Sequence, residues 1–236
     1  MPEGIIADVR DELEACRDEA VIAGGVKFFK EPVAMRGVKT ATVRRISGYY
    51  FRQLRGTTKE EIFGLCEELL GSGFCEDAFI AFDWAHRLHR EYVPADFVLF
   101  ERWVEEYVSN WATCDTFCTH AVGSFIELYP AYTAKLKEWA RSPNRWLRRA
   151  GAVSLILPAR KGRFLDDALE IAGILVEDRD DLVQKGYGWL LKEASRQHRQ
   201  RVFDFVMSHR AHMPRTALRY AIEKMPQHLR EQAMAR

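Results

Sequence analysis

The chain lacks the features of several protein classes. No uninterrupted apolar run reaches about 18 residues, so no transmembrane helix is predicted. Only 8 of the 236 residues are proline and 15 are glycine, which argues against extended disorder. The first ten residues carry two acids and one arginine ahead of any long apolar stretch, unlike a secretory signal. We therefore expect an ordinary globular protein of the cytoplasm.

Cysteine is scarce, and the common cofactor motifs are missing. The five cysteines are odd in number and scattered, which argues against a disulfide framework. Cys114, Cys118 and His120 could be drawn as metal ligands, but no second cysteine pair accompanies them. His86 and His89 lack the glutamate of a zinc protease and are interpreted as a surface pair. Glycine-rich nucleotide loops and the Gly-x-Ser-x-Gly turn are absent, so neither a metal nor another cofactor is expected.

The charges are unevenly distributed along the chain. The formal net charge is +1, but residues 119–236 hold 21 Lys and Arg against 13 Asp and Glu, a net +8. Residues 1–118 hold 14 against 21, a net −7. This asymmetry suggests that the second half offers a basic face to a polyanion such as nucleic acid. A chance imbalance of solvated helix faces would give the same counts, so both interpretations stay open.

Almost every segment has the apolar periodicity of an amphipathic helix, and none alternates with the period of a strand. Thr57 and Thr58 ahead of Glu60 and Glu61 form a capping-box-like start for a helix that runs to Leu70. The other predicted helices cover about 5–23, 40–54, 75–90, 94–108, 114–128, 132–141, 145–157, 163–176, 180–193, 197–208, 214–224 and 226–235.

About a dozen short helices indicate an all-α fold, either a solenoid or a compact bundle. Trp111, Trp146 and Trp189 favour the solenoid, because they are 35 and 43 residues apart and a HEAT-type helix pair repeats every 40–47 residues or so. We therefore predict a single domain over residues 1–236, a superhelix of HEAT-like repeats. Its concave side would form a groove for an extended ligand such as duplex DNA.

Trp111 and Asp115 are four residues apart, so on a helix their side chains share one face. An indole and a carboxylate side by side suit a flat, cationic ligand, because the ring face and the carboxylate are both negative. The alternative is structural: a core tryptophan beside an aspartate that caps a helix.

Two later segments also combine unusual residues. Three arginines lie within five residues at a predicted helix start, where they could bind phosphate or form a salt-bridged surface turn. These are Arg145, Arg148 and Arg149. Gly186 and Gly188 lie inside a later helix beside Trp189, although each glycine costs about 1 kcal/mol relative to alanine. That cost suggests close approach by a neighbouring helix or by a ligand, with Trp189 in the core or on a groove.

Taken in order, the three segments resemble a known family. The patterns are Trp-x-x-x-Asp from Trp111, Trp-x-Arg-Arg-Ala from Trp146 and Gln-Lys-Gly-x-Gly-Trp-x-Leu-Lys-Glu from Gln184. Together they resemble the bacterial alkylpurine DNA glycosylases of the AlkD type, in the DNA alkylation repair family, which are built from HEAT-like repeats. The resemblance extends from about Phe28 to Ala221 and includes Met35-Arg36-Gly37-Val38-Lys39-Thr40.

The resemblance implies roles for individual residues. Trp111 and Trp189 correspond to the two aromatic residues that hold the damaged nucleotide in the family. Asp115 corresponds to its catalytic carboxylate, and Arg149 to its phosphate-binding arginine. Phe28 falls where the family often has an aromatic residue near the lesion. Gly186 stands where the family often has alanine, a departure expected to be harmless. Further basic residues flank the motifs and could neutralise phosphates without reading sequence: Arg145, Arg148, Lys185, Lys192, Arg196 and Arg199.

The implied function is that of a monomeric glycosylase that removes purines alkylated at N3 or N7 from double-stranded DNA, without a pocket for a flipped base. Because a cationic base leaves readily, a fixed carboxylate that stabilises positive charge on the sugar suffices. The alternative is a HEAT-repeat scaffold that binds DNA or protein without catalysis. Asp115 discriminates between the two, because a carboxylate facing phosphates only repels them. Whether the lesion is N7-methylguanine, N3-methyladenine or a bulky adduct stays open, as does a role in general repair or in self-resistance.

Overall fold

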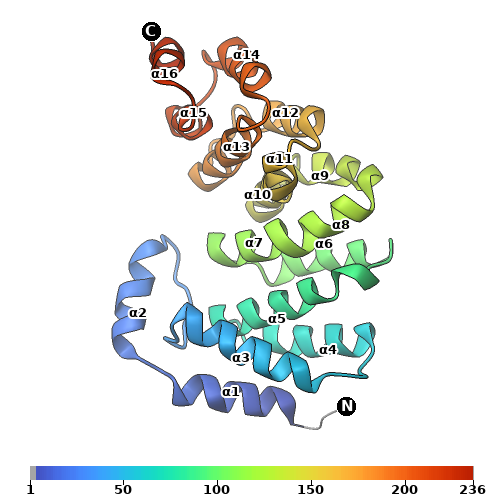
Figure 1. Cartoon of the computed structure of the whole chain (residues 1–236). Helices are drawn as coiled ribbons and strands as arrows, with labels where there is room; N and C mark the ends of the chain where they lie inside the picture. Colours follow the sequence, from blue (N-terminus) through green and yellow to red (C-terminus); the bar gives the residue numbers. More distant parts are fainter. Residues whose placement is uncertain (1–3, 236) are drawn as a thin grey trace. The chain divides into compact units, whose positions relative to one another are not determined.

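The computed structural model describes residues 4–235, and every regular element in this range is helical (Figure 1). No strand occurs among these residues, so the predicted all-α fold is confirmed. The α-helices are α1 (Ile5–Ala15), α2 (Glu19–Gly25), α3 (Thr40–Gln53), α4 (Lys59–Leu70), α5 (Cys75–Arg87), α6 (Asp96–Glu106), α7 (Trp111–Phe117), α8 (Gly123–Leu128), α9 (Thr133–Trp139), α10 (Arg145–Val153), α11 (Ile156–Arg160), α12 (Leu165–Ile174), α13 (Asp181–Ala194), α14 (Arg199–His209), α15 (Arg215–Ile222) and α16 (Gln227–Met234). None of the helices in the described part of the chain is long and apolar enough to cross a bilayer.

The helices form two compact units. Unit 1 comprises the described residues up to Asp96 together with Glu106–Phe117, and unit 2 comprises Phe97–Glu105 and the described chain from Cys118 onward. Each unit has its own core of buried apolar side chains. Unit 1 buries Leu13, Ile46, Leu69 and Trp84, and unit 2 buries Trp103, Phe125, Trp139 and Tyr187. The single domain inferred from the sequence stays a prediction.

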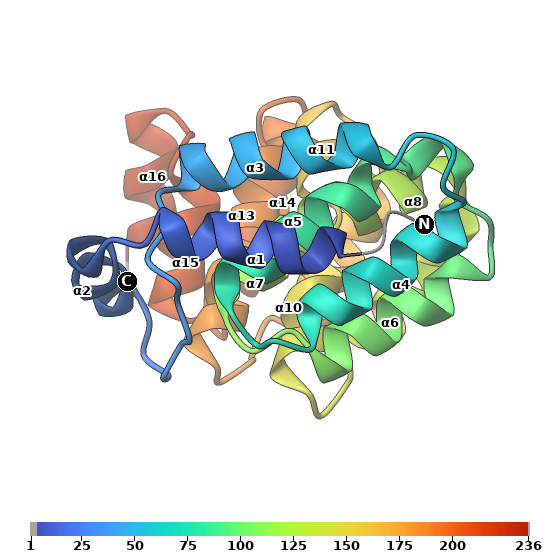
Figure 2. The ribbon, with the colours of Figure 1, turned by 90° about the horizontal axis from the view of Figure 1, so that it is seen from below.

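In unit 1, α1 packs against both α3 and α4, and α4 packs against α5 (Figure 2). The sequence explains why α1 lies there, because its four buried residues recur at helical spacing on one face. They are Ile5, Ile6, Val9 and Leu13. Full burial of such a side chain stabilises the fold by about 1.5–3 kcal/mol.

Capping residues decide where two helices of unit 1 begin. As predicted, Thr58 and Glu61 form a capping box at α4: the Thr58 N–H donates to Glu61 at 2.9 Å, and the Glu61 N–H donates to the Thr58 hydroxyl at 3.3 Å. The single helix predicted over 5–23 is wrong, because α1 ends at Ala15 and α2 begins after Asp18. The Asp18 carboxylate accepts a hydrogen bond from the Ala20 N–H at 2.9 Å, so it satisfies the start of a new helix.

Two predicted helices near the candidate site also have different bounds. The one predicted over 114–128 begins at Trp111 and is interrupted by a π-helical turn at Cys118–Val122. The one predicted over 145–157 ends at Val153, and α11 follows separately. Pro158 lacks the N–H that would bond to the carbonyl of residue 154 in a continuous helix, which explains this break.

Helix α13 packs against α10, α11, α12 and α15 of unit 2, and glycine lets α15 come very close (Figure 1). A Cβ added at Gly188 would lie 2.7 Å from the Cβ of Tyr220 and 2.9 Å from the carbonyl oxygen of Ala217. Gly151 of α10 similarly faces α9, since an added Cβ would lie 2.7 Å from the carbonyl oxygen of Leu136. For Gly188, close approach by a neighbouring helix is therefore the correct interpretation.

Candidate active site

Helix α7 carries two of the predicted site residues, and Asn110 sets its start. The Asn110 side chain is 2% exposed, and its Oδ1 accepts hydrogen bonds from the N–H groups of Ala112 and Thr113, both at 3.0 Å. Its Nδ2 donates to the Cys75 Sγ at 3.4 Å. Burial raises the pKa of the Cys75 thiol to about 12, so the sulfur remains a neutral thiol near pH 7. This buried asparagine cap places Trp111 in the first turn of α7.

Asp115 lies one helical turn after Trp111, as the four-residue spacing predicts. Both residues are partly exposed, whereas Cys114 and Phe117 on the same helix are buried. Because Asn110 supplies the cap, the alternative in which Asp115 caps a helix is wrong. Helix α7 therefore presents an indole and a carboxylate together on a partly exposed face.

The segment that follows α2 holds the Trp111 indole in place. The Trp111 Nε1–H donates to the backbone carbonyl of Phe28 at 3.2 Å. The ring of Phe29 stacks on Trp111, with ring centroids 5.5 Å apart and an interplanar angle of 24°. Phe28 itself has a side chain that is 75% exposed, so its reach toward a lesion stays a prediction.

Three of the predicted phosphate-binding residues each form an ion pair in unit 2. The pairs are Arg145–Asp180 at 2.9 Å, Arg148–Asp178 at 2.6 Å and Lys185–Asp181 at 3.1 Å. The salt-bridged surface turn left open by the sequence is therefore present. The three cationic side chains nevertheless remain 32%, 20% and 35% exposed, so a polyanion can compete with the aspartates for them.

Arg149 has a different environment from its neighbours. It is 5% exposed, and its Nη1 donates to the backbone carbonyl of Leu182 near the start of α13. A Cβ added at Gly186 would lie 3.4 Å from the Arg149 Cγ and 3.6 Å from its Nη1. These are ordinary van der Waals distances, which supports the expectation that alanine is harmless at this position. Arg149 thus links α10 to α13, and its phosphate-binding role stays a prediction.

Burial divides the six tryptophans into two sets. Trp84, Trp103 and Trp139 are buried in the cores. Trp111, Trp146 and Trp189 are partly exposed, and they are the tryptophans of the three sequence motifs. Trp189 follows Gly188 on α13 yet stays partly exposed, so the alternative of a core tryptophan is wrong there.

The structure thus places the predicted residues in two groups. Unit 1 holds Trp111, Asp115 and Phe28. Unit 2 holds Arg145, Arg148, Arg149, Lys185 and Trp189. Across residues 4–235, no three His, Cys, Asp or Glu side chains gather closely enough to hold a metal ion.

A family model described as DNA alkylation repair enzyme matches residues 9–225, which include every residue of both groups. The chain belongs to this family. As a DNA alkylation repair enzyme, it has a role in the repair of alkylation damage, with DNA as its substrate.

A solved structure has the same fold as this DNA alkylation repair enzyme. It is described as a predicted DNA alkylation repair enzyme from Enterococcus faecalis and has a TM-score of 0.80. The match covers 89% of this chain and 97% of that one, at 16% sequence identity. At such identity the likeness shows the fold alone. No curated protein matches the chain.

Two contributors to the candidate site of this DNA alkylation repair enzyme were not predicted. Asn110 caps α7, and Phe29 supplies the ring that stacks on Trp111. The aromatic doublet Phe28-Phe29 between Lys27 and Lys30 is the sequence signal that could have revealed the second. Asn110 has the residue type of a helix cap, and it was missed because the helix was expected to begin at Cys114.

Proposed function

We propose that this DNA alkylation repair enzyme is a monofunctional glycosylase that removes purines made cationic by alkylation at N3 or N7 from duplex DNA. The observation that carries the proposal is the pair on α7. There the Asp115 carboxylate lies one turn from the Trp111 indole, and both residues are partly exposed. The family membership supports a repair role, and this pair supplies the chemistry of base release.

The reaction needs charge stabilisation more than proton donation. The C1′–N bond of the damaged nucleotide breaks with its electron pair leaving on the purine, which thereby becomes neutral. Positive charge builds on the deoxyribose, and a fixed carboxylate at Asp115 stabilises it. A water oxygen then bonds to C1′, and its proton passes to the carboxylate or to solvent, as in glycoside hydrolysis.

The partly exposed tryptophans of the motifs would contribute to DNA binding through their ring faces. An indole face attracts a cation by about 0.5–2 kcal/mol, so Trp111 and Trp189 would both favour a charged sugar or base. Phe29 holds the Trp111 ring by stacking, which lowers the entropy that the indole would lose on binding. Arg149 and its neighbours would contact the phosphates around the lesion.

Release of free base from a duplex oligonucleotide with a single N7-methylguanine tests this proposal. We expect the wild-type protein to release the base without cutting the DNA strand. If it binds the duplex but releases no purine from either methylated or bulkier cationic lesions, the alternative of a silent DNA-binding scaffold replaces the proposal.

A bulky cationic adduct should be released at a rate similar to that of a methylated base. Most glycosylases flip the base into a pocket that limits its size. We propose that this enzyme uses its tryptophans and carboxylate on the sugar and backbone, so the size of the base matters little. Rates measured on duplexes with N7-methylguanine and with a polycyclic N7 adduct should agree within about tenfold, a difference of 1.4 kcal/mol in activation free energy. Strict restriction to methyl lesions would contradict this expectation.

Binding to duplex DNA should weaken steeply with salt. The ion pairs of Arg145 and Lys185 are partly exposed, and surface ion pairs contribute only about 0–1 kcal/mol, so phosphates can displace these aspartates at little cost. The logarithm of the DNA association constant falls linearly with the logarithm of the salt concentration, and each neutralised phosphate steepens this fall by about 0.9. Arg145→Ala should therefore make the fall shallower by about one, measured by fluorescence anisotropy over about 50–200 mM salt.

Arg201→Ala is the matched control for the salt experiment. Arg201 is also an arginine of unit 2 that pairs with an aspartate, Asp166, at 2.7 Å. Because Arg201 lies outside the three motifs, its replacement should leave the slope unchanged. Equal slopes for wild type and Arg145→Ala would remove Arg145 from the proposed DNA contacts.

A further inference from the structure

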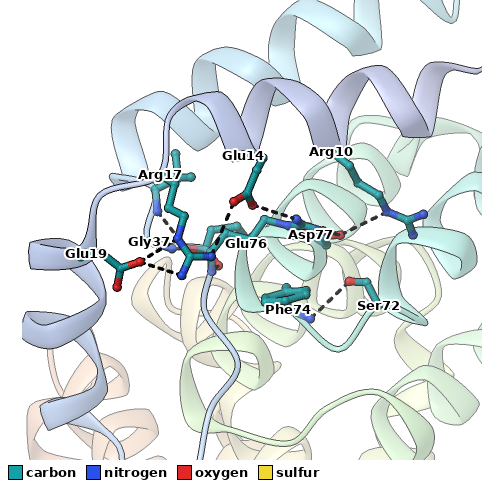
Figure 3. Close-up of polar contacts among 11 residues, drawn as sticks. Arg10, Glu14, Arg17, Glu19, Gly37, Ser72, Phe74, Glu76 and Asp77 are labelled. Atoms are coloured by element: carbon teal, nitrogen blue, oxygen red, sulfur yellow. Dashed lines mark hydrogen bonds and ion pairs between the residues drawn. The ribbon is translucent and has the colours of Figure 1, made fainter.

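Two carboxylates in the first turn of α5 lie outside the candidate site and are almost completely buried (Figure 3). Glu76 is 1% exposed and Asp77 is 0% exposed. A buried carboxylate is strongly unfavourable unless hydrogen bonds or opposite charges compensate it. The partners of these two residues therefore indicate what they hold in place.

Glu76 binds three consecutive backbone N–H groups of the segment that joins α2 to α3. Its Oε2 accepts from Arg36 at 2.9 Å, and its Oε1 accepts from Gly37 at 2.9 Å and from Val38 at 3.1 Å. Gly37 has φ +86°, and an added Cβ would lie 2.7 Å from the carbonyl oxygen of Asp18. Only glycine fits this turn, so the backbone is shaped to present its N–H groups to one carboxylate.

Asp77 neutralises the arginine of the same turn. The Arg36 guanidinium donates to both carboxylate oxygens, at 2.5 and 3.0 Å, and its carbon lies 4.4 Å from the centroid of the Phe74 ring. The Arg10 guanidinium also reaches Asp77, at 3.6 Å, as Figure 3 shows. The hydrogen bond to Asp77 raises the pKa of Arg36, so the guanidinium stays charged.

We call residues 28–39 the strap, because contacts hold this segment in both its first and its second half. In its second half, the Cys75 N–H donates to the carbonyl of Ala34 at 3.0 Å, and Glu76 binds the N–H groups of residues 36–38. In its first half, the Phe29 ring stacks on Trp111, and the Phe28 carbonyl accepts the hydrogen bond from the indole. Cys75 also accepts a hydrogen bond from Asn110, the cap of α7. The first turn of α5 thus contacts both the strap and the helix that carries Trp111.

We propose that Glu76 is a positioning residue of the candidate site. By holding the strap, Glu76 fixes the Phe29 ring and the Phe28 carbonyl against the Trp111 indole, and so sets the orientation of that indole beside Asp115. Only the activity part of this proposal rests on the proposed glycosylase function; the positioning of Trp111 does not.

The contacts explain why the strap matters for orientation rather than for folding. Helix α7 keeps its own cap at Asn110 and its buried residues Cys114 and Phe117, so it does not need the strap to form. The indole, in contrast, is held from the strap by one stacked ring and one hydrogen bond, each a modest interaction of about 0.5–1.5 kcal/mol. Loss of the anchor at Glu76 therefore reorients Trp111 while the core stays intact.

Fluorine NMR of the full chain labelled with 5-fluorotryptophan tests this directly. The six tryptophans give six resonances, and Trp111→Phe identifies that of Trp111. We expect Glu76→Ala to shift or broaden the Trp111 resonance and to leave those of the core residues Trp84, Trp103 and Trp139 unchanged. Glu76→Gln keeps one carbonyl acceptor and should give a smaller change.

Asp96→Asn is the matched control, because Asp96 is another buried carboxylate of unit 1. It pairs with Lys59 at 2.8 Å and accepts a hydrogen bond from the Val93 N–H at 2.8 Å, and neither partner belongs to the strap. This variant should lose stability without moving the Trp111 resonance. An unmoved Trp111 resonance in Glu76→Ala, or an equal shift of all six resonances, would overturn the proposal.

Phe29→Ala provides a test that does not disturb any buried carboxylate. Phe29 is partly exposed, so this variant should fold normally and should reproduce the shifted Trp111 resonance.

Under single-turnover conditions, Glu76→Ala and Phe29→Ala should lower the rate of base release by about 10- to 100-fold, because small displacements of a binding group have effects of that size. Duplex affinity should stay close to that of the wild type. Variants that shift the resonance but retain the full rate would show that Glu76 positions Trp111 without serving catalysis. If the wild type itself releases no base, the glycosylase proposal fails, and the resonances still decide the positioning role.

Discussion

Asp115→Asn is expected to lower the rate of base release by about 100- to 1,000-fold, the effect of removing one preorganised electrostatic group from an active site. Asparagine has nearly the shape of aspartate but no charge, so it cannot stabilise positive charge on the deoxyribose. Helix α7 should be undisturbed, because its cap is Asn110 and its buried residues do not include Asp115. Duplex affinity should be retained or slightly increased, since a negative charge near the phosphates is lost.

Single-turnover release of N7-methylguanine, measured beside duplex binding, checks this expectation. Asp166→Asn is a suitable control, because Asp166 is 86% exposed and pairs only at the surface with Arg201. Its rate should equal that of the wild type. Unchanged base release by Asp115→Asn would remove the carboxylate from the mechanism and leave the activity to another group.

Gly188→Ala and Gly186→Ala should have opposite effects on stability, although the two positions lie on the same helix. At Gly188 the new methyl group would lie 2.7 Å from the Tyr220 Cβ and 2.9 Å from the Ala217 carbonyl oxygen. Because both contacts are with main-chain or Cβ atoms of α15, neither can move aside by rotating a side chain. We expect α13 and α15 to be forced apart, with a loss of about 1–3 kcal/mol in the free energy of unfolding.

At Gly186 the nearest atoms to an added Cβ belong to the side chains of Arg149 and Val153, at 3.4 to 3.6 Å. Alanine fits there without a clash and reduces the conformational freedom of the unfolded chain. Gly186→Ala should therefore stabilise the protein by about 0.5–1 kcal/mol. Urea denaturation of both variants measures the difference. Equal midpoints would mean that α13 and α15 do not meet as closely as these distances require.

The sequence alone contained the local features of this protein. Helical periodicity predicted an all-α fold, and the Thr58 capping box marked the start of α4. The four-residue spacing of Trp111 and Asp115 predicted a shared helix face. These features depend on residues within one or two helical turns of each other, where the backbone geometry is nearly fixed by the helix itself.

Tertiary structure decided which of these residues are accessible and what holds them. Sequence spacing could not separate the core tryptophans from Trp111 and Trp189, because burial depends on helices distant in the chain. The hydrogen bond from Trp111 to the Phe28 carbonyl spans 83 residues of sequence, and that from the Gly37 N–H to Glu76 spans 39. Contacts over such separations leave no periodic signal, since they arise only when folded helices bring distant turns together. The choice of Phe29 as the residue stacked on Trp111, and of Glu76 as the anchor of the strap, therefore belongs to the tertiary structure.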